Sequence, residues 1–153
     1  MKKIAGPLRI NLAQYHEMAT FVKFGAELDA ATKAQLARGQ RGRELLKQPQ
    51  YQPMPVEEQV VLLYAVVEGY LDDIPVDRIS QFETAFLKFL RESRPEILEG
   101  IKKAKDLTAE NENRLKAAIS EFRKAFLQSE EAEARKREES DEESAKEYVT
   151  ETD

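Results

Sequence analysis

The sequence predicts an all-α fold, a bundle of about six helices followed by a disordered acidic tail. All six prolines and all six glycines lie between Gly6 and Gly100, where they divide the chain into short segments. Within those segments apolar residues recur every three or four positions, as on one face of a helix, without the alternation of a strand. This pattern stops after Leu127. We therefore divide the chain into a helical domain, residues 1–127, and a tail, residues 128–153.

The first two helices are expected on either side of Gly25, which suits a C-terminal cap because glycine enters the left-handed region without steric cost. The apolar stripe of the first helix comprises Ile4, Leu8, Leu12, Tyr15, Ala19 and Val22. Asp29 is the expected N-cap of the second helix, residues 30–47. Gly39 and Gly42 inside this helix each cost ~1 kcal/mol relative to alanine. Such a pair indicates close approach by a neighbouring backbone or a bend.

Four further helices follow in the same manner. The third starts after Pro55, and its apolar residues run nearly all round, which predicts burial on most sides. The fourth, about residues 76–92, carries the stripe Ile79, Phe82, Phe86 and Phe89. The fifth opens at Pro95 and closes on basic residues at the negative end of the helix dipole, namely Lys102, Lys103 and Lys105. Thr108 is the expected N-cap of the sixth, with the stripe Leu115, Ile119, Phe122 and Phe126.

The tail carries the acidity of the whole chain. Residues 129–153 hold eleven acids and four bases, whereas the whole chain has a net charge of −5. Only five of these residues are apolar, so the segment buries too little surface to offset the entropy of ordering it. We expect it to be disordered, with at most a transient helix near Ala132.

The residue inventory excludes several chemistries. The absence of cysteine excludes thiol catalysis and thiolate metal sites, and one histidine, His16, excludes histidine clusters. No phosphate-binding loop, dinucleotide fingerprint or H-E-x-x-H motif occurs. Glu57 and Glu58 are adjacent on a helix and do not face each other, so a helix-start role or a solvated face is favoured over an acid–base pair. We assign no catalytic and no metal-ligating residue, and expect no activity from this chain alone.

Composition also bounds location and partners. The body is nearly neutral, without the concentrated basic face of a nucleic-acid binder. No apolar run approaches the ~20 residues that a membrane helix requires, and no apolar segment follows the basic start as in a secretory signal. We therefore expect a cytoplasmic protein with no nucleic-acid partner and no direct membrane insertion.

Two surface features each allow two interpretations. The second helix carries a basic set that is either a solvated face or a dock for an acidic partner: Lys33, Arg38, Arg41, Arg43 and Lys47. The connector of residues 48–55 contains three prolines and alternating glutamines. It is either an ordinary polar loop or a stiff loop whose amides recognise a base edge.

Five collinear motifs carry a resemblance: AGPLR (5–9), LAQY (12–15), FGAELDAAT (24–32), LLKQPQY (45–51) and GYLD (69–72). Together they resemble the C-terminal helical domain of the alpha subunit of F-type ATP synthases, over about residues 1–127. The resemblance implies that barrel and nucleotide-binding domains would precede this part of the chain. The sequence is then a truncated alpha subunit, that is, a fragment, a broken gene or the product of a late internal start.

The resemblance implies roles for particular residues. Gln48 and Gln50 match glutamines near the adenine of ATP with magnesium at the non-catalytic site of the full subunit; this chain alone is not expected to bind it tightly. The expected stalk-facing loop is Glu27, Leu28, Asp29, Ala30, Ala31 and Thr32. Beta subunits and the gamma central stalk are the implied partners, in a complex peripheral on the inner face of the cell membrane during proton-driven ATP synthesis.

Two positions depart from the family pattern. Val66 stands where relatives often have glycine and requires extra room beside the third helix. His16 stands where a basic residue is common. Two other classes stay open beside the family assignment: a free-standing helical protein-interaction module and an unrecognised enzyme. The first would use the basic second helix and the acidic tail as its binding surfaces.

Overall fold

The computed structural model describes the backbone of residues 2–23, 29–47 and 53–150, and the side chains of residues 4–22, 29–47 and 53–135. Within these ranges the chain forms helices and no strand. The elements are α1 (Lys2–Lys23), α2 (Ala30–Leu45), α3 (Val56–Val67), the short 3-10 helix η1 (Val76–Arg78), α4 (Ile79–Ser93), α5 (Pro95–Ala104) and α6 (Ala109–Thr150). The predicted all-α bundle of six helices is confirmed.

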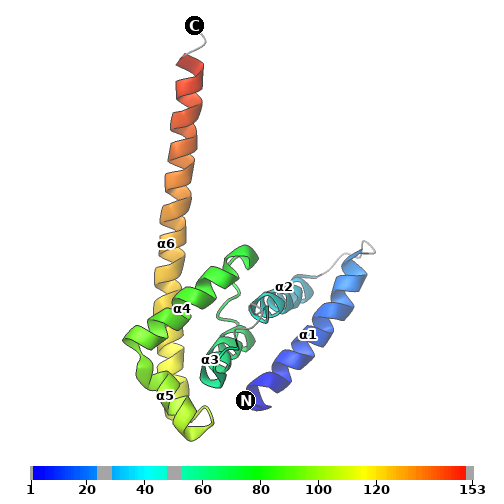
Figure 1. Ribbon diagram of the computed structural model, residues 1–153. Helices are drawn as coiled ribbons and strands as arrows, with labels where there is room; N and C mark the ends of the chain where they lie inside the picture. The colour runs from blue at the N-terminus through cyan, green and yellow to red at the C-terminus, as the bar shows by residue number, and fades with distance from the viewer. Residues whose placement is uncertain (1, 24–28, 48–52, 151–153) are drawn as a thin grey trace.

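Helix α3 lies at the centre of the bundle (Figure 1), with α1 and α2 on one side and α5 packed against it. It is buried nearly all round, as its composition predicts: Val60, Val61, Leu62, Tyr64, Ala65 and Val66 are each at most 4% exposed. Of its other apolar residues, Leu63 and Val67 are half-buried and Val56, in the first turn, is 58% exposed. The central helix is therefore enclosed along its length but open at its N-terminal end.

An aromatic cluster joins α4 to the first half of α6. The rings of Phe82 and Phe86 are fully buried, and each lies 5.4 Å from the ring of Phe122, measured between centroids. Phe126 contacts Phe82 edge to face at 5.3 Å. Edge-to-face and tilted aromatic pairs add stabilisation beyond the apolar area that they bury. The stripes predicted for the fourth and sixth helices are thus the two faces of one contact.

The helix ends follow the local signals of the sequence. The carboxylate of Asp29 accepts a hydrogen bond from the backbone N–H of Thr32 at 3.3 Å, which confirms this N-cap. The hydroxyl of Thr108 accepts from the N–H of Asn111 at the same distance, at the start of α6. Pro95 is the first residue of α5, where its missing N–H costs nothing. The expected cap at Gly25 lies outside the described residues.

The first helix is buried along only part of its predicted stripe. Ile4 and Leu8 are 8% and 6% exposed, whereas Val22 is 41% exposed. Pro7 lies inside α1, and the helix continues through it to Lys23.

Helix α6 extends through the segment that the sequence predicts to be disordered. Figure 1 shows it leaving the bundle and projecting far beyond it. Residues 131–135 are all exposed. Glutamate, alanine, lysine and arginine are good helix formers, which accounts for helical geometry without burial. The disorder of the tail in solution stays a prediction.

Candidate functional site

The expected stalk-facing loop leads into the N-terminus of α2. Asp29 caps the helix, and Ala30, Ala31 and Thr32 form its first turn with exposed or half-exposed side chains. The hydrogen bond from Thr32 lowers the pKa of the Asp29 carboxyl below its ordinary value. Glu27 and Leu28 lie outside the described residues. The four described residues of this segment therefore form a capped, solvent-facing helix start.

The candidate nucleotide-contacting residues, Gln48 and Gln50, also lie outside the described residues. The part of the connector that is described begins at Pro53. Met54 packs against the core, and its carbonyl accepts a hydrogen bond from the Gln59 side-chain amide at 2.8 Å. The connector is thus anchored to α3 at its C-terminal end.

The basic set on α2 is partly an internal structure. Arg38 donates from Nε to Oδ1 of Asp72 at 3.1 Å, and the two side chains also pair through Nη2 and Oδ2. Arg41 donates from Nε to the carbonyl of Ile74 at 2.8 Å and caps Ala37 on its own helix. These arginines tie α2 to the connection between α3 and η1, so they are not free to bind an acidic partner.

The turn that ends α3 explains the GYLD motif. Gly69 has φ +78, in the left-handed region, and its N–H donates to the carbonyl of Val66, while Tyr70 donates to Ala65. This pair of bonds satisfies the last carbonyls of the helix. A Cβ at Gly69 would lie 2.6 Å from Nη2 of Arg38. The glycine is thus required twice, by its backbone conformation and by the ion pair of Arg38 with Asp72.

The glycines inside α2 mark a close helix crossing, as their cost predicts. A Cβ at Gly39 would lie 2.5 Å from Cβ of Tyr15 on α1. A Cβ at Gly42 would meet Leu8 of α1 and Val66 of α3, each at 3.4 Å. The room that Val66 requires is therefore provided by Gly42, and Val66 is only 2% exposed.

A two-pronged ion pair joins α3 to α4. Arg91 donates from Nε and Nη2 to the two carboxylate oxygens of Glu58, both at 2.7 Å. The Glu58 side chain is 7% exposed and that of Arg91 is 56% exposed. The carboxylate of Glu58 raises the pKa of Arg91. Of the two options considered for Glu58, a solvated face is wrong: it lies in the first turn of α3, but its charge is enclosed and paired.

Charged and polar contacts also fix the first half of α6. Arg123 pairs with Asp73. Arg78 pairs with Glu130 at 2.9 Å, and the side chains of Arg78 and Glu130 are each about four-fifths buried. The Tyr64 hydroxyl on α3 donates to Glu112 at 2.9 Å. Desolvation is the main cause that raises the pKa of the Tyr64 hydroxyl, and this hydrogen bond to Glu112 raises it further. Asp72 and Asp73, adjacent in sequence, thus bind arginines of two different helices.

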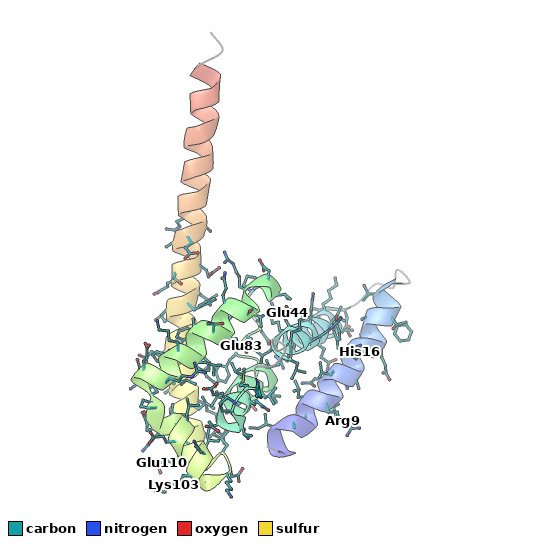
Figure 2. The ribbon with its side chains drawn as sticks, viewed as in Figure 1. Arg9, His16, Glu44, Glu83, Lys103 and Glu110 are labelled. Atoms are coloured by element: carbon teal, nitrogen blue, oxygen red, sulfur yellow. The ribbon has the colours of Figure 1, made fainter. Side chains whose placement is uncertain are left out.

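Three features remain to be placed: possible metal ligands, the single histidine and the apolar length of the helices. Among them no group of three or more histidine or carboxylate side chains is arranged to hold a metal ion. His16 is exposed (Figure 2); its ring meets that of Tyr15 edge on at 5.5 Å, and its carbonyl accepts a hydrogen bond from the Thr20 hydroxyl at 3.0 Å. None of the described helices is long and apolar enough to cross a membrane. These ion pairs were missed from sequence because their partners lie 33 to 52 positions apart, and the residue types alone carried no pairing signal.

Fold and site together define a class: a closed helical domain whose polar side chains fasten its own helices to one another. Residues 1–122 match the family model described as the ATP synthase alpha/beta chain, C-terminal domain, so the chain belongs to this family. It is 54% identical over 127 residues to the ATP synthase subunit alpha of Desulforudis audaxviator (strain MP104C). That match covers 83% of this chain and 25% of the relative, so the chain spans about a quarter of the relative's length. The resemblance read from the motifs is confirmed.

Proposed function

We propose that this chain acts as the C-terminal helical domain of an ATP synthase alpha subunit, a non-catalytic part of the ring of alpha and beta subunits around the central stalk. The observation that carries the proposal is the 54% identity over 127 residues, 83% of this chain. The family match over residues 1–122 contains the GYLD turn and the glycine crossing, so the matched region is a structural unit rather than an isolated motif.

Its role in that assembly is mechanical. A close-packed interior has low compressibility and transmits strain, and the core of this bundle extends through all six helices. The pairs of Arg38 with Asp72 and of Arg91 with Glu58 fix α2 and α4 relative to α3. We assign to the bundle the task of keeping the nucleotide-binding domains in register while the gamma stalk turns.

The segment Glu27, Leu28, Asp29, Ala30, Ala31 and Thr32 is assigned to the side that faces the gamma stalk. The capped start of α2 supports this role, because the Asp29 cap fixes where the helix begins and hence where the loop before it ends. A loop that stays in place beside a turning stalk requires a helix start whose position is fixed in this way.

Gln48 and Gln50 are assigned to the adenine end of a non-catalytic site for ATP with magnesium in the full subunit. Phosphate groups are bound mainly by charged side chains and backbone N–H groups. We assign those contacts to a preceding domain of the full subunit. The chain alone should therefore bind the nucleotide weakly. Calorimetric titration with magnesium ATP tests this, and saturable tight binding would contradict the assignment.

Size-exclusion chromatography of the chain mixed with beta and gamma subunits tests the main proposal. We expect co-elution of the chain with the beta subunit. A chain that elutes as it does alone, whatever subunit is added, would instead favour the free-standing interaction module. The Ala31→Trp variant should reduce association with the gamma subunit, while Thr84→Trp, on an exposed part of α4, serves as the matched control.

We place the assembled complex peripherally on the inner face of the cell membrane, with this chain in the cytoplasm. The proposal requires no catalytic residue in the chain. An ATPase activity that co-purifies with the chain and survives Gln48→Ala and Gln50→Ala would support the third class, an unrecognised enzyme, and contradict the mechanical role.

A further inference from the structure

The segment between α3 and α4 is bonded to two helices that pack on largely different neighbours. We call residues 68–78, which include η1, the α3–α4 connection. Helix α2 packs mainly against α1, α3 and α4, whereas α6 packs mainly against α4 and α5. A segment that is bonded to both α2 and α6 can therefore pass a displacement of one helix to the other.

On one side the connection is bonded to α2. Arg38 donates from Nε to Oδ1 of Asp72 at 3.1 Å, and Arg41 donates from Nε to the carbonyl of Ile74 at 2.8 Å. The side chain of Ile74 is fully buried, so the carbonyl that Arg41 contacts belongs to a residue of the core. Hydrogen bonds from a guanidinium are stronger than neutral ones because the donor is charged. Helix α2 is thus fastened to the connection at two nearby points.

On the other side the connection is bonded to α6. Asp73 pairs with Arg123, and Arg78 pairs with Glu130 at 2.9 Å. The side chains of Arg78 and Glu130 are 19% and 20% exposed, so salt screens this pair less than an exposed one. Residues 131–135 are all exposed, and Glu130 is the last described residue of α6 that the bundle partly encloses. The connection therefore holds α6 at the point where the helix leaves the bundle.

The connection is itself stiff. Three backbone hydrogen bonds close successive turns within it, at 3.2, 3.0 and 3.0 Å, from the N–H of Asp72 to Gly69, of Ile74 to Leu71 and of Arg78 to Pro75. Asp72 and Asp73 are adjacent, with Cα atoms about 3.8 Å apart, and they bind arginines of two different helices. A stiff segment cannot absorb a displacement of one of these carboxylates without moving the other.

We propose that the α3–α4 connection couples α2 to the last anchored turns of α6, so that a displacement of α2 changes how firmly α6 is held at Glu130. Energetic coupling of this kind is carried by ion-pair networks and rigid segments. The coupling is a property of the chain by itself; it rests on the proposed function only for the origin of the displacement, the stalk-facing start of α2.

Hydrogen exchange of the full chain tests the coupling, with the amides of residues 124–130 as the readout. Arg38→Met removes a bond between α2 and the connection, far along the chain from these amides. We expect their exchange to be about tenfold faster, as for the loss of one hydrogen bond to a charged group. Arg38→Lys keeps the charge without the planar fork of donors and should give a smaller increase.

Arg91→Met is the matched control. It also removes an arginine from a two-pronged pair, but that pair joins α3 to α4 outside the connection. We expect it to lower the free energy of unfolding and yet leave exchange in residues 124–130 unchanged, because amides near the end of a held segment exchange through local opening. An equal acceleration in Arg91→Met would show that general loosening of the bundle is responsible and would overturn the proposal.

The double variant Arg38→Met with Glu130→Gln distinguishes coupling from two independent effects. If α2 acts on α6 through the connection, the increase in exchange rate is smaller than the product of the two single increases. Increases that multiply, or a wild-type rate in Arg38→Met, would contradict the coupling. The chain is measured without beta or gamma subunits, so this result and the co-elution test of the proposed function can each fail without affecting the other.

Discussion

The two halves of α6 have the same backbone geometry but are held by different forces. The first half, to about Leu127, buries Leu115 and Ile119 completely and contributes Phe122 to the aromatic cluster. The second half, from residue 131, begins with five consecutive exposed residues and continues in a sequence rich in acids. Tertiary packing stabilises the first half, whereas residues 131–135 are all exposed, so intrinsic propensity and not burial favours the helix there. Helical geometry therefore does not by itself indicate a stable helix.

The contrast predicts that substitutions of buried side chains in the bundle will lower the free energy of unfolding strongly. Phe82→Ala removes a fully buried ring that contacts Phe86, Phe122 and Phe126. We expect a loss of about 3–5 kcal/mol in the free energy of unfolding, measured by urea denaturation. The matched control is Phe21→Ala, whose ring is 62% exposed and whose loss should cost less than about 0.5 kcal/mol. Equal losses would show that burial does not distinguish the two positions.

The α1–α2 crossing allows the same contrast with glycines. Gly39→Ala places a Cβ 2.5 Å from Cβ of Tyr15, so one of the two backbones must shift. We expect a cost of about 1–3 kcal/mol. Gly6→Ala, with no atom within 4 Å of the new Cβ, should instead stabilise α1 by up to about 1 kcal/mol. Thermal melts of both variants measure the difference, and a neutral Gly39→Ala would mean that the helices are not closely packed there.

Ion pairs divide in the same way, into enclosed and exposed. Arg91→Met leaves the buried carboxylate of Glu58 without its partner, which should cost about 1–3 kcal/mol. Arg94→Met breaks the exposed pair with Glu121 and should cost at most about 1 kcal/mol. Chemical denaturation of both variants, with and without Glu58→Gln, separates loss of the pair from loss of packing. A larger effect at Arg94 would contradict the assignment of Glu58 as the enclosed charge.

Much of this arrangement was predictable from the sequence, for identifiable reasons. The stripes of the fourth and sixth helices, Asp29, Thr108 and Pro95 act within one or two helical turns, so their signals are local and their predictions are confirmed. The stripe of the first helix is buried only in part. Gly39 and Gly42 were also informative. Glycine lowers the stability of a helix, so two of them in one helix indicate close packing by neighbouring side chains, here Tyr15 and Val66.

The long-range pairing was not predictable. Nothing near Glu58 distinguishes it from Glu57, and only the fold brings Arg91, 33 positions later, into contact with it. The same holds for Asp72 and Asp73, whose arginine partners lie on different helices. The predicted roles of Gln48 and Gln50 came from family resemblance and stay predictions, because these residues lie outside the described structure. Sequence patterns thus predicted the helices, while the contacts that fix them relative to one another required the structure.

A smaller and pH-dependent effect is expected at Glu83 of α4 (Figure 2), which is half-buried. Burial raises the pKa of its carboxyl above the ordinary value. The folded chain therefore holds this proton more tightly than the unfolded chain, and its contribution to stability falls as pH rises through that interval. Glu83→Gln should be slightly more stable than wild type at neutral pH and equal to it well below the ordinary pKa. Denaturation curves at several pH values measure this, and an advantage that grows on acidification would contradict it.

The smallest effect is expected from removing the second half of α6. A chain that ends at Glu130 keeps the pair of Arg78 with Glu130 and every buried residue of the core. Its free energy of unfolding, measured at a concentration where the chain is monomeric, should match that of the full chain within about 0.5 kcal/mol. Hydrogen exchange of the full chain should show protected amides in residues 111–127 and fast exchange from residue 131 on, because opening free energies are lowest where side chains are exposed, as in residues 131–135. Strong protection beyond residue 131, or a large loss of stability on truncation, would mean that the tail is held by more than helix propensity.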